Sequence, residues 1–351
     1  MTITGKPWGV MPDGREVQLF TLVNRRGMQA TITNYGGIIV SLTAPAKNGT
    51  MADVVLGYDT LDEYINGRGY FGAVVGRVAN RVSNGRFELD GVTHEVSKNK
   101  PTFQLHGGAG GFHSRLWNAD IVDDIEGSHL VLSYHSPDGE EGYPGNLDAT
   151  VIYTLTERGL KMVFRAETDA PTVVTMTNHA YFNLSGSVTE DVLDHVVTLN
   201  ASRYLVTDSD QIPTGEIADV AGTPLDFTRP KAIGLHIDAP HEAIGIGQGF
   251  DHYYVIDSDP GEMAPAGQIF HGGTGRVLEV CTTQPGMQFY SGNHMADRIN
   301  GKLGAMYGFR SGFCVETQGY VDAPNRPEFP AITLRPGEIY EHTTEYRLSR
   351  M

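Results

Sequence analysis

Apolar side chains along this chain recur mostly at every second position, as Ala30 and Ile32 do between threonines. A period of two is typical of strands that bury one face. Two such segments, 87–89 and 92–96, flank the dipeptide Asp90-Gly91. The dipeptide predicts a hairpin with a two-residue turn, in which both turn residues adopt positive φ angles.

Two longer strands are predicted over residues 150–156 and 160–166, joined by a short loop that contains glycine. Helical periodicity is almost absent, and one short helix is expected at 60–65, where Thr60 and Glu63 stand at capping-box spacing. Many strands without alternating helices exclude a parallel βαβ sheet and favour an all-β, large antiparallel sandwich. No fixed repeat or linker-like composition interrupts the chain, so we expect residues 1–351 to form one domain.

The net charge of −16 argues against nucleic acid or an anionic membrane as a partner and disfavours strongly anionic substrates. The two cysteines, Cys281 and Cys314, form no C-x-x-C motif, and we expect two buried thiols rather than a disulfide scaffold. The first residues lack the pattern of a secretory signal, and no apolar run approaches membrane-spanning length. We therefore expect a cytoplasmic protein.

Residues 178–184 read Asn-His-Ala-Tyr-Phe-Asn-Leu and set His179 among strand-forming aromatics and amides that can bind a polyhydroxylated ligand. Far downstream, Glu316 stands in the sequence Val-Glu-Thr-Gln at 315–318. A lone histidine in a strand is more often structural, so the interpretation depends on the other functional residues that accompany it. Burial and neighbouring charges can shift the pKa values of a histidine and a carboxylate towards 7, where proton donors and acceptors work best at neutral pH. The two residues together indicate proton transfer at a sugar site.

The segment 76–82 presents Arg77 and Arg81 four positions apart, and continued strand alternation would point both to the same side. Its Asn80 and Arg81 are suited to gripping vicinal hydroxyls, although a salt-bridged strand end is the more common outcome for an arginine pair. His106 precedes a glycine-rich loop that lacks the Lys-Ser/Thr of a phosphate loop. Its small residues are expected to let a ligand approach the backbone closely.

Two further segments contribute polar groups next to turns. Asp251 stands at the entrance of an aromatic strand, and Gln284 precedes a Pro-Gly turn. Each is unremarkable in isolation. The 13 histidines show neither His-Glu-x-x-His nor His-x-His spacing, so we expect no metal site.

Taken together, the segments around these residues resemble the aldose 1-epimerase (galactose mutarotase) family. The resemblance rests on six ordered motifs, within a stretch from about Asn34 to the Pro-Gly-Glu at 336–338: Gly-Arg-Val-Ala-Asn-Arg at 76–81, Leu-His-Gly-Gly at 105–108, Asn-His-Ala-Tyr-Phe-Asn-Leu at 178–184, Gly-Phe-Asp-His at 249–252, Thr-Gln-Pro-Gly at 283–286 and Glu-Thr-Gln at 316–318. It implies a β-supersandwich and an isomerase that interconverts the anomers of a free aldose without a cofactor.

The resemblance also implies roles for single residues. His179 matches the family's general acid and Glu316 its general base, while the ligand-binding positions match Asn80, Arg81, His106, Asp251 and Gln284. The chain departs from the family where Gly319-Tyr320 replaces a frequent His-Phe, and where Asn293-His294 replaces a frequent Asn-Phe. These departures affect the preferred sugar more than the chemistry. The sequence does not decide among galactose, glucose, xylose and arabinose.

Three alternatives stay open at this point. A glycosidase would need two carboxylates at the scissile bond, and only Glu316 stands in a motif typical of a sugar site. A hexose-phosphate epimerase of related fold would need a basic phosphate pocket. A non-catalytic carbohydrate-binding protein would lack one of the two proton-transfer residues.

Overall fold

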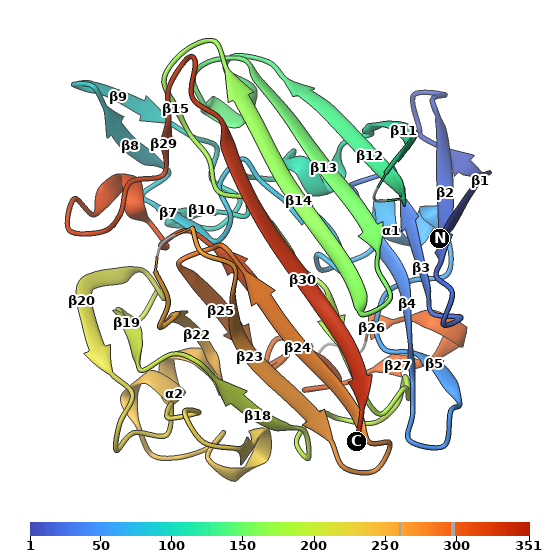
Figure 1. The fold of residues 1–351 in the computed structure, drawn as a ribbon. Helices are drawn as coiled ribbons and strands as arrows, with labels where there is room; N and C mark the ends of the chain where they lie inside the picture. The colour runs from blue at the N-terminus through green and yellow to red at the C-terminus, as the bar shows by residue number, and fades with distance from the viewer. Residues whose placement is uncertain (126, 260, 296–298) are drawn as a thin grey trace.

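The computed structural model describes residues 1–125, 127–259, 261–295 and 299–351, and its architecture is built from antiparallel sheets. The largest has nine strands and crosses the molecule with β30 near its middle (Figure 1). In spatial order its strands are β11 (Asn118–Asp124), β12 (Gly127–Ser136), β13 (Leu147–Leu155), β14 (Gly159–Thr168), β30 (Tyr340–Arg350), β24 (Arg276–Thr282), β23 (Ala264–His271), β18 (Val196–Leu199) and β21 (Lys231–Ala232).

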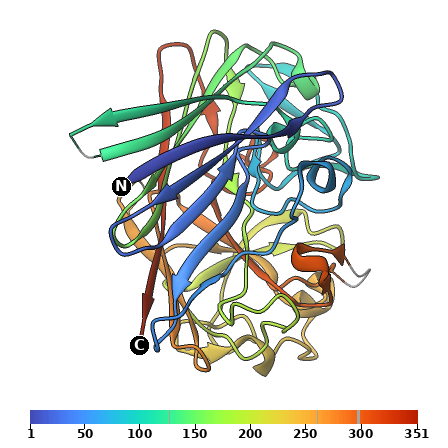
Figure 2. The same cartoon turned by 90° about the vertical axis from the view of Figure 1, so that its right-hand side faces the viewer.

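Two smaller sheets complete the main framework. The six-stranded sheet has the order β17 (Tyr181–Phe182), β28 (Phe313–Gln318), β25 (Gly286–Tyr290), β22 (Asp251–Val255), β19 (Arg203–Thr207) and β20 (Pro213–Asp219). The five-stranded sheet has the order β1 (Thr2–Val10), β2 (Glu16–Val23), β3 (Gln29–Thr33), β4 (Ile39–Pro45) and β5 (Met51–Asp53). Both chain ends lie on the side of the molecule along which β30 runs (Figure 2).

Short elements connect these sheets. The two-stranded pairs are β6 (Val74–Val75) with β16 (Thr177–Asn178), β7 (Arg81–Ser83) with β10 (Phe103–Leu105), β8 (Arg86–Leu89) with β9 (Val92–Glu95), β15 (Thr172–Val173) with β29 (Thr333–Leu334), and β26 (Ile299–Asn300) with β27 (Met306–Tyr307). The helices are α1 (Leu61–Asn66) and α2 (Glu242–Gly247), with short 3₁₀ turns η1 (Phe112–Ser114), η2 (Glu140–Gly142), η3 (Ile233–Leu235), η4 (Lys302–Gly304) and η5 (Ala323–Asn325).

The core lies between the nine-stranded and six-stranded sheets. Phe164 and Tyr346 of the large sheet share one buried cluster with Phe289 and Val315 of the smaller sheet. Successive strand residues point to opposite faces. Phe313 and Val315 of β28 therefore pack into the core, while Cys314 and Glu316 point away from it. Packing against the core thus fixes the six-stranded sheet, and the side chains on its other face are available to form a site.

The predicted local elements are confirmed. The 87–96 segment forms the β8–β9 hairpin, with φ of 52° at Asp90 and 78° at Gly91. The two long strands form β13 and β14, paired from Leu147 to Leu155. Thr60 and Glu63 cap α1 as a capping box. Helix α2 has no counterpart among the predicted elements.

The two cysteines are buried free thiols, as predicted. Among the described residues, no helix is long and apolar enough to cross a membrane.

Candidate active site

A cavity of about 290 Å³ opens on the face of the six-stranded sheet that points away from the core. It brings together residues that are far apart in the sequence. Its lining is formed by Arg68, Gly69, Tyr70, Phe71, Asn80, Arg81, Lys100, Leu105, His106, His179, Tyr181, Asp251, Gln288, Tyr290, His294, Met295, Ile299 and Glu316.

Strand pairing places the acidic and amide groups side by side. Glu316 of β28 lies directly opposite Gln288 of β25, and Asp251 of β22 lies opposite Tyr290 of β25. Paired residues in adjacent strands point to the same face, so these side chains converge on the cavity. Glu316 is only 2% exposed, and its Oε2 atom is buried without a hydrogen-bond partner. An orphaned carboxylate oxygen in a polar cavity suits contact with a ligand hydroxyl.

His179 lies beside this carboxylate. Its Nε2 atom is 3.5 Å from Glu316 Oε1, and its Nδ1 atom is 3.5 Å from the Sγ of Cys314. The imidazole stacks on Tyr181 and Tyr70, with ring centroids 4.9 and 5.6 Å away. His179 is 4% exposed. The two residues predicted to transfer protons are therefore neighbours in one buried site.

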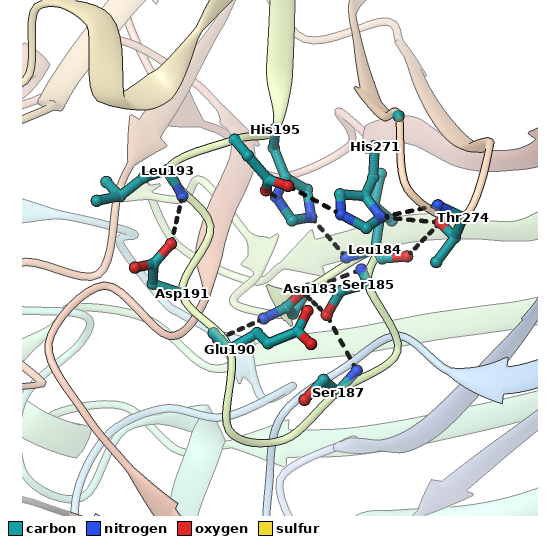
Figure 3. A network of polar contacts seen from close by, with 12 residues as sticks. Asn183, Leu184, Ser185, Ser187, Glu190, Asp191, Leu193, His195, His271 and Thr274 are labelled. Carbon is teal, nitrogen blue, oxygen red and sulfur yellow. Dashed lines mark hydrogen bonds and ion pairs between the residues drawn. The ribbon is translucent and has the colours of Figure 1, made fainter.

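The two asparagines of the motif around His179 hydrogen-bond to the backbone and hold this part of the chain in place. Asn178 Nδ2 donates to the carbonyl of Gly72 at 2.7 Å, and Asn183 Nδ2 donates to that of Ser311 at 3.0 Å. The next amide, Leu184 N–H, donates to a buried histidine, His195 (Figure 3). The expectation that these amides bind a polyhydroxylated ligand is wrong, since neither asparagine lines the cavity.

His106 is fixed by the backbone of Asn80. The Nδ1 atom of its ring accepts a hydrogen bond from the backbone N–H of Asn80 at 3.2 Å, and the backbone N–H of His106 donates to the Asn80 carbonyl at 2.8 Å. The glycine that follows serves the fold rather than the ligand. A Cβ at Gly107, where φ is 80°, would lie 1.8 Å from the carbonyl oxygen of Gly76. Neither Gly107 nor Gly108 lines the cavity, contrary to the expected ligand approach.

Arg81 and Asn80 lie in the cavity, but Arg77 does not. Strand alternation fails between them because β6 ends at Val75, β7 begins at Arg81, and Asn80 adopts a φ of 65°. The Arg77 guanidinium is buried and donates to Ser136 and to nearby backbone carbonyls. The expected same-side orientation of the two arginines is therefore wrong.

A closed ring of hydrogen bonds links the polar residues of the site. Arg81 donates to Asn80 Oδ1 at 2.9 Å, Asn80 Nδ2 to Gln288 Oε1 at 3.1 Å, and Gln288 Nε2 to Asp251 Oδ1 at 2.7 Å. On the other side, Arg81 donates to Gln211 Oε1 at 2.5 Å and Gln211 Nε2 to Asp251 Oδ2 at 2.7 Å. Arg81 and Asp251 themselves are 3.9 Å apart.

The structure places Gln284 outside this cavity. Its Nε2 donates to the hydroxyl of Tyr340 at 2.9 Å, and it lines a separate cavity of about 790 Å³. Gln288, four residues later, lies in the site instead. Its signal in the sequence is a single amide between Met287 and Phe289 in a strand that is otherwise apolar apart from its tyrosine.

Burial shifts the pKa values of His179 and Glu316 in opposite directions. It lowers the pKa of His179 to about 4 and raises the pKa of Glu316 well above its usual range. The negative charge of Asp251 adds to the raised pKa of Glu316 and opposes the lowered pKa of His179, while Arg81 lowers the pKa of Glu316. Burial, followed by the charges of His179 and Arg81, holds the pKa of His106 well below its usual range. Burial therefore favours the neutral carboxyl of Glu316 and the neutral imidazole of His179 over their charged forms.

His106, His179 and Glu316 each offer a ligand atom, and these atoms lie within 4.8 Å of one another. Two histidines and one carboxylate form a common zinc-binding set. A neutral histidine that accepts a hydrogen bond at Nδ1 carries its proton on Nε2, and His106 accepts from Asn80 N–H. A metal on His106 would have to displace either this proton or this hydrogen bond. The protonation of His106 therefore opposes a metal in this trio.

The two departures from the family pattern differ in position. His294 is exposed, lines the cavity and stacks on Tyr290, with ring centroids 5.9 Å apart. Tyr320 is buried against Tyr253 and Phe329 and lines the separate cavity. Only His294 is therefore in a position to contact a ligand in the site.

Known proteins resemble this chain over nearly its whole length. A family model described as aldose 1-epimerase matches residues 18–347. A galactose mutarotase of Bos taurus is 42% identical over 350 residues, 99% of each chain, and an aldose 1-epimerase of Escherichia coli strain K12 is 35% identical over 339 residues, 96% of each. The crystal structure of an aldose epimerase homologue from C. elegans matches with a TM-score of 0.86 and 30% identity, covering 95% of this chain and 99% of that chain, and confirms the predicted fold. The chain therefore belongs to the aldose 1-epimerase family of isomerases.

Proposed function

We propose that this protein interconverts the α and β anomers of a free aldose, with His179 as general acid and Glu316 as general base. Its family makes it an isomerase that acts on a sugar. The observation that supports the assignment of roles most strongly is the 3.5 Å contact between the two side chains within a polar cavity. Asn80, Arg81, His106, Asp251 and Gln288 line the same cavity and supply donors and acceptors for sugar hydroxyls.

The proposed reaction opens and recloses the pyranose ring. Glu316, as carboxylate, removes the proton of the O1 hydroxyl while the C1–O5 bond breaks and His179, as imidazolium, delivers a proton to O5. The aldehyde rotates about the C1–C2 bond. Closure on its other face reverses both proton transfers and returns the pair to its starting state. Each positioned acid or base contributes roughly 10²- to 10⁴-fold to the rate.

Burial of the pair favours the ring-opening step. The step converts a carboxylate and an imidazolium into a carboxylic acid and a neutral imidazole. Desolvation, which raises the pKa of Glu316 and lowers that of His179, stabilises these neutral products relative to the ion pair. The neutral carboxyl and the neutral imidazole, which burial favours, are therefore the forms that accompany the open-chain aldose in the proposed reaction.

The cavity is less suited to glycoside hydrolysis. Glycosidases use two carboxyl groups at about 5–5.5 Å or 6.5–9.5 Å that act on opposite sides of one bond. Here both oxygens of Asp251 already accept hydrogen bonds from Gln211 and Gln288, whereas Glu316 has a free oxygen and a histidine partner. Asp251 therefore suits hydroxyl binding, with Glu316 as the reactive carboxylate.

A hexose-phosphate epimerase stays as the second candidate, because the exposed Arg68 and Lys100 line this cavity despite the net charge of −16. Galactose is the first substrate to test, since relatives that cover 99% of this chain are named galactose mutarotases. We also propose that residues 1–351 act as one domain, supported by the family match over 18–347, and that the protein works in the cytoplasm, where buried free thiols persist.

Polarimetry tests the proposed function. Freshly dissolved α-anomers of galactose, glucose, xylose and arabinose, and of galactose 6-phosphate, are followed to their equilibrium rotation with and without the protein. We expect faster equilibration of at least one free aldose. Acceleration restricted to the phosphate would favour the second candidate. Binding without any acceleration would identify a carbohydrate-binding protein and contradict the proposal.

A further inference from the structure

Gln211 completes the hydrogen-bond ring of the site, although it lies outside every segment that the sequence analysis singled out. We propose that Gln211 is a positioning residue for sugar binding, which keeps Asp251 and Arg81 apart and correctly oriented. The inference rests on the proposed function, because it assigns Asp251 and Arg81 to the sugar hydroxyls.

The ring has a direction that follows from its chemistry. Arg81 only donates hydrogen bonds, and a carboxylate such as Asp251 only accepts them. Each amide between them, on either arm of the ring, accepts from the arginine side and donates toward the carboxylate. One arm contains two amides, Asn80 and Gln288. The other arm consists of Gln211 alone, so this one side chain sets the geometry of that arm.

Gln211 acts as a spacer between two opposite charges. The guanidinium and the carboxylate are 3.9 Å apart, with side chains 11% and 10% exposed. Direct charge-assisted pairs of this type normally close to about 2.7–2.9 Å. Without the amide, Arg81 and Asp251 could form such a direct pair. Their donors and acceptors would then no longer be available to bind sugar hydroxyls. The amide accepts from Arg81 and donates to Asp251 while leaving the two charged groups separate.

The hairpin between β19 and β20 presents Gln211 in a fixed position. Gln211 adopts a φ of 58°, and its N–H donates to the Asp208 carbonyl at 2.9 Å. The Asp208 carboxylate accepts from the backbone N–H groups of Asp210 and Ile212, at 2.9 and 3.0 Å. Thr102 donates to the side chain of Asp210 at 3.0 Å, next to β10, which pairs with the strand that begins at Arg81. The turn is thus held by hydrogen bonds of its own backbone and side chains.

The test compares Gln211→Met, which keeps length but removes both hydrogen bonds, with Ser209→Ala at the exposed tip of the same hairpin. We expect Gln211→Met to raise KM for galactose about 10-fold, as for the loss of hydrogen bonds to charged groups, with kcat within about threefold. Ser209→Ala is expected to behave as wild type. Thermal melts of both variants check folding.

A double-mutant cycle separates positioning from direct contact or general support. In an Asp251→Ala background, Gln211→Met should raise KM by a smaller factor than in the wild type, because only Arg81 remains for it to position. An equal loss in both backgrounds would overturn the proposal, as would wild-type kinetics of Gln211→Met.

A second variant covers the case in which Gln211→Met does not fold. Gln211→Glu keeps the acceptor for Arg81 but sets a carboxylate against Asp251, so KM should rise at neutral pH. It should recover as pH falls and the introduced carboxyl gains a proton to donate. A pH-independent KM relative to wild type would contradict the proposal.

Failure of the proposed function is distinguishable from failure of this inference. If the wild type binds galactose without turnover, the proposed function is refuted, and calorimetric Kd values of the same variants decide the role of Gln211. If the wild type neither turns over nor binds any aldose, both are refuted.

Discussion

Replacing Asp251 with asparagine removes one negative charge from the sugar site with little change in shape. The carboxylate accepts two hydrogen bonds at 2.7 Å, from Gln211 and Gln288, and an amide in its place keeps only one acceptor oxygen. Its NH₂ group would face one of the two amide donors. A hydrogen bond to a charged group contributes about 1.5–3 kcal/mol, so kcat/KM should fall about 10- to 100-fold.

The same variant should shift the pH dependence. In the proposed reaction the His179–Glu316 pair must hold one proton, so kcat/KM should fall at low pH when the pair takes a second proton and at high pH when it loses the shared one. Asp251 raises the pKa values of both groups. Its neutralisation lowers both, and the whole profile should move to lower pH.

The assay is polarimetric anomerisation of galactose by Asp251→Asn from pH 4 to pH 9, with wild type in parallel and a thermal melt of each. Kinetics equal to those of wild type, on every aldose tried, would remove Asp251 from the sugar site. A reduced rate with an unshifted profile would refute the electrostatic coupling to the pair but not the role in binding.

Three further outcomes follow from the structure. Arg77→Met should lower the melting temperature, because several buried carbonyls lose their donor at about 1–3 kcal/mol each, yet leave KM unchanged in the folded protein; a raised KM would return Arg77 to the site. Gln288→Met should raise KM for galactose about 10-fold and Gln284→Met should not, and the reverse order would restore the position inferred from the sequence. Dialysis against a strong chelator should leave the rate unchanged, because the protonation of His106 opposes a metal ligand; activity that vanished and returned with one divalent ion would contradict this.

The strands could be predicted from the sequence because their signals are local. Alternating apolar residues, the Asp90-Gly91 turn and the Thr60–Glu63 capping box each act within a few positions, and all three are found in the structure. The family resemblance also singled out His179 and Glu316, since each stands in a distinctive motif. Here the structure adds their 3.5 Å contact.

The parts that sequence reasoning missed depend on distant pairings. Gln288 belongs to the site because its strand pairs with the one that bears Glu316, 28 positions later, whereas Gln284 falls before that strand begins. Gln211 reaches Arg81 across 130 positions of sequence from the tip of a hairpin. Arg77 was misplaced because a positive φ at Asn80 breaks the alternation that the prediction assumed. None of these facts has a local signature.

The central claim is that Glu316 and His179 transfer the protons of ring opening. The most direct test is the polarimetric kcat of Glu316→Gln on the best aldose, because this change keeps shape and hydrogen-bonding capacity but removes basicity. We expect a loss of at least about 10²-fold in kcat, with a folded protein and a similar loss for His179→Asn. Near-normal turnover by a folded Glu316→Gln variant would contradict it.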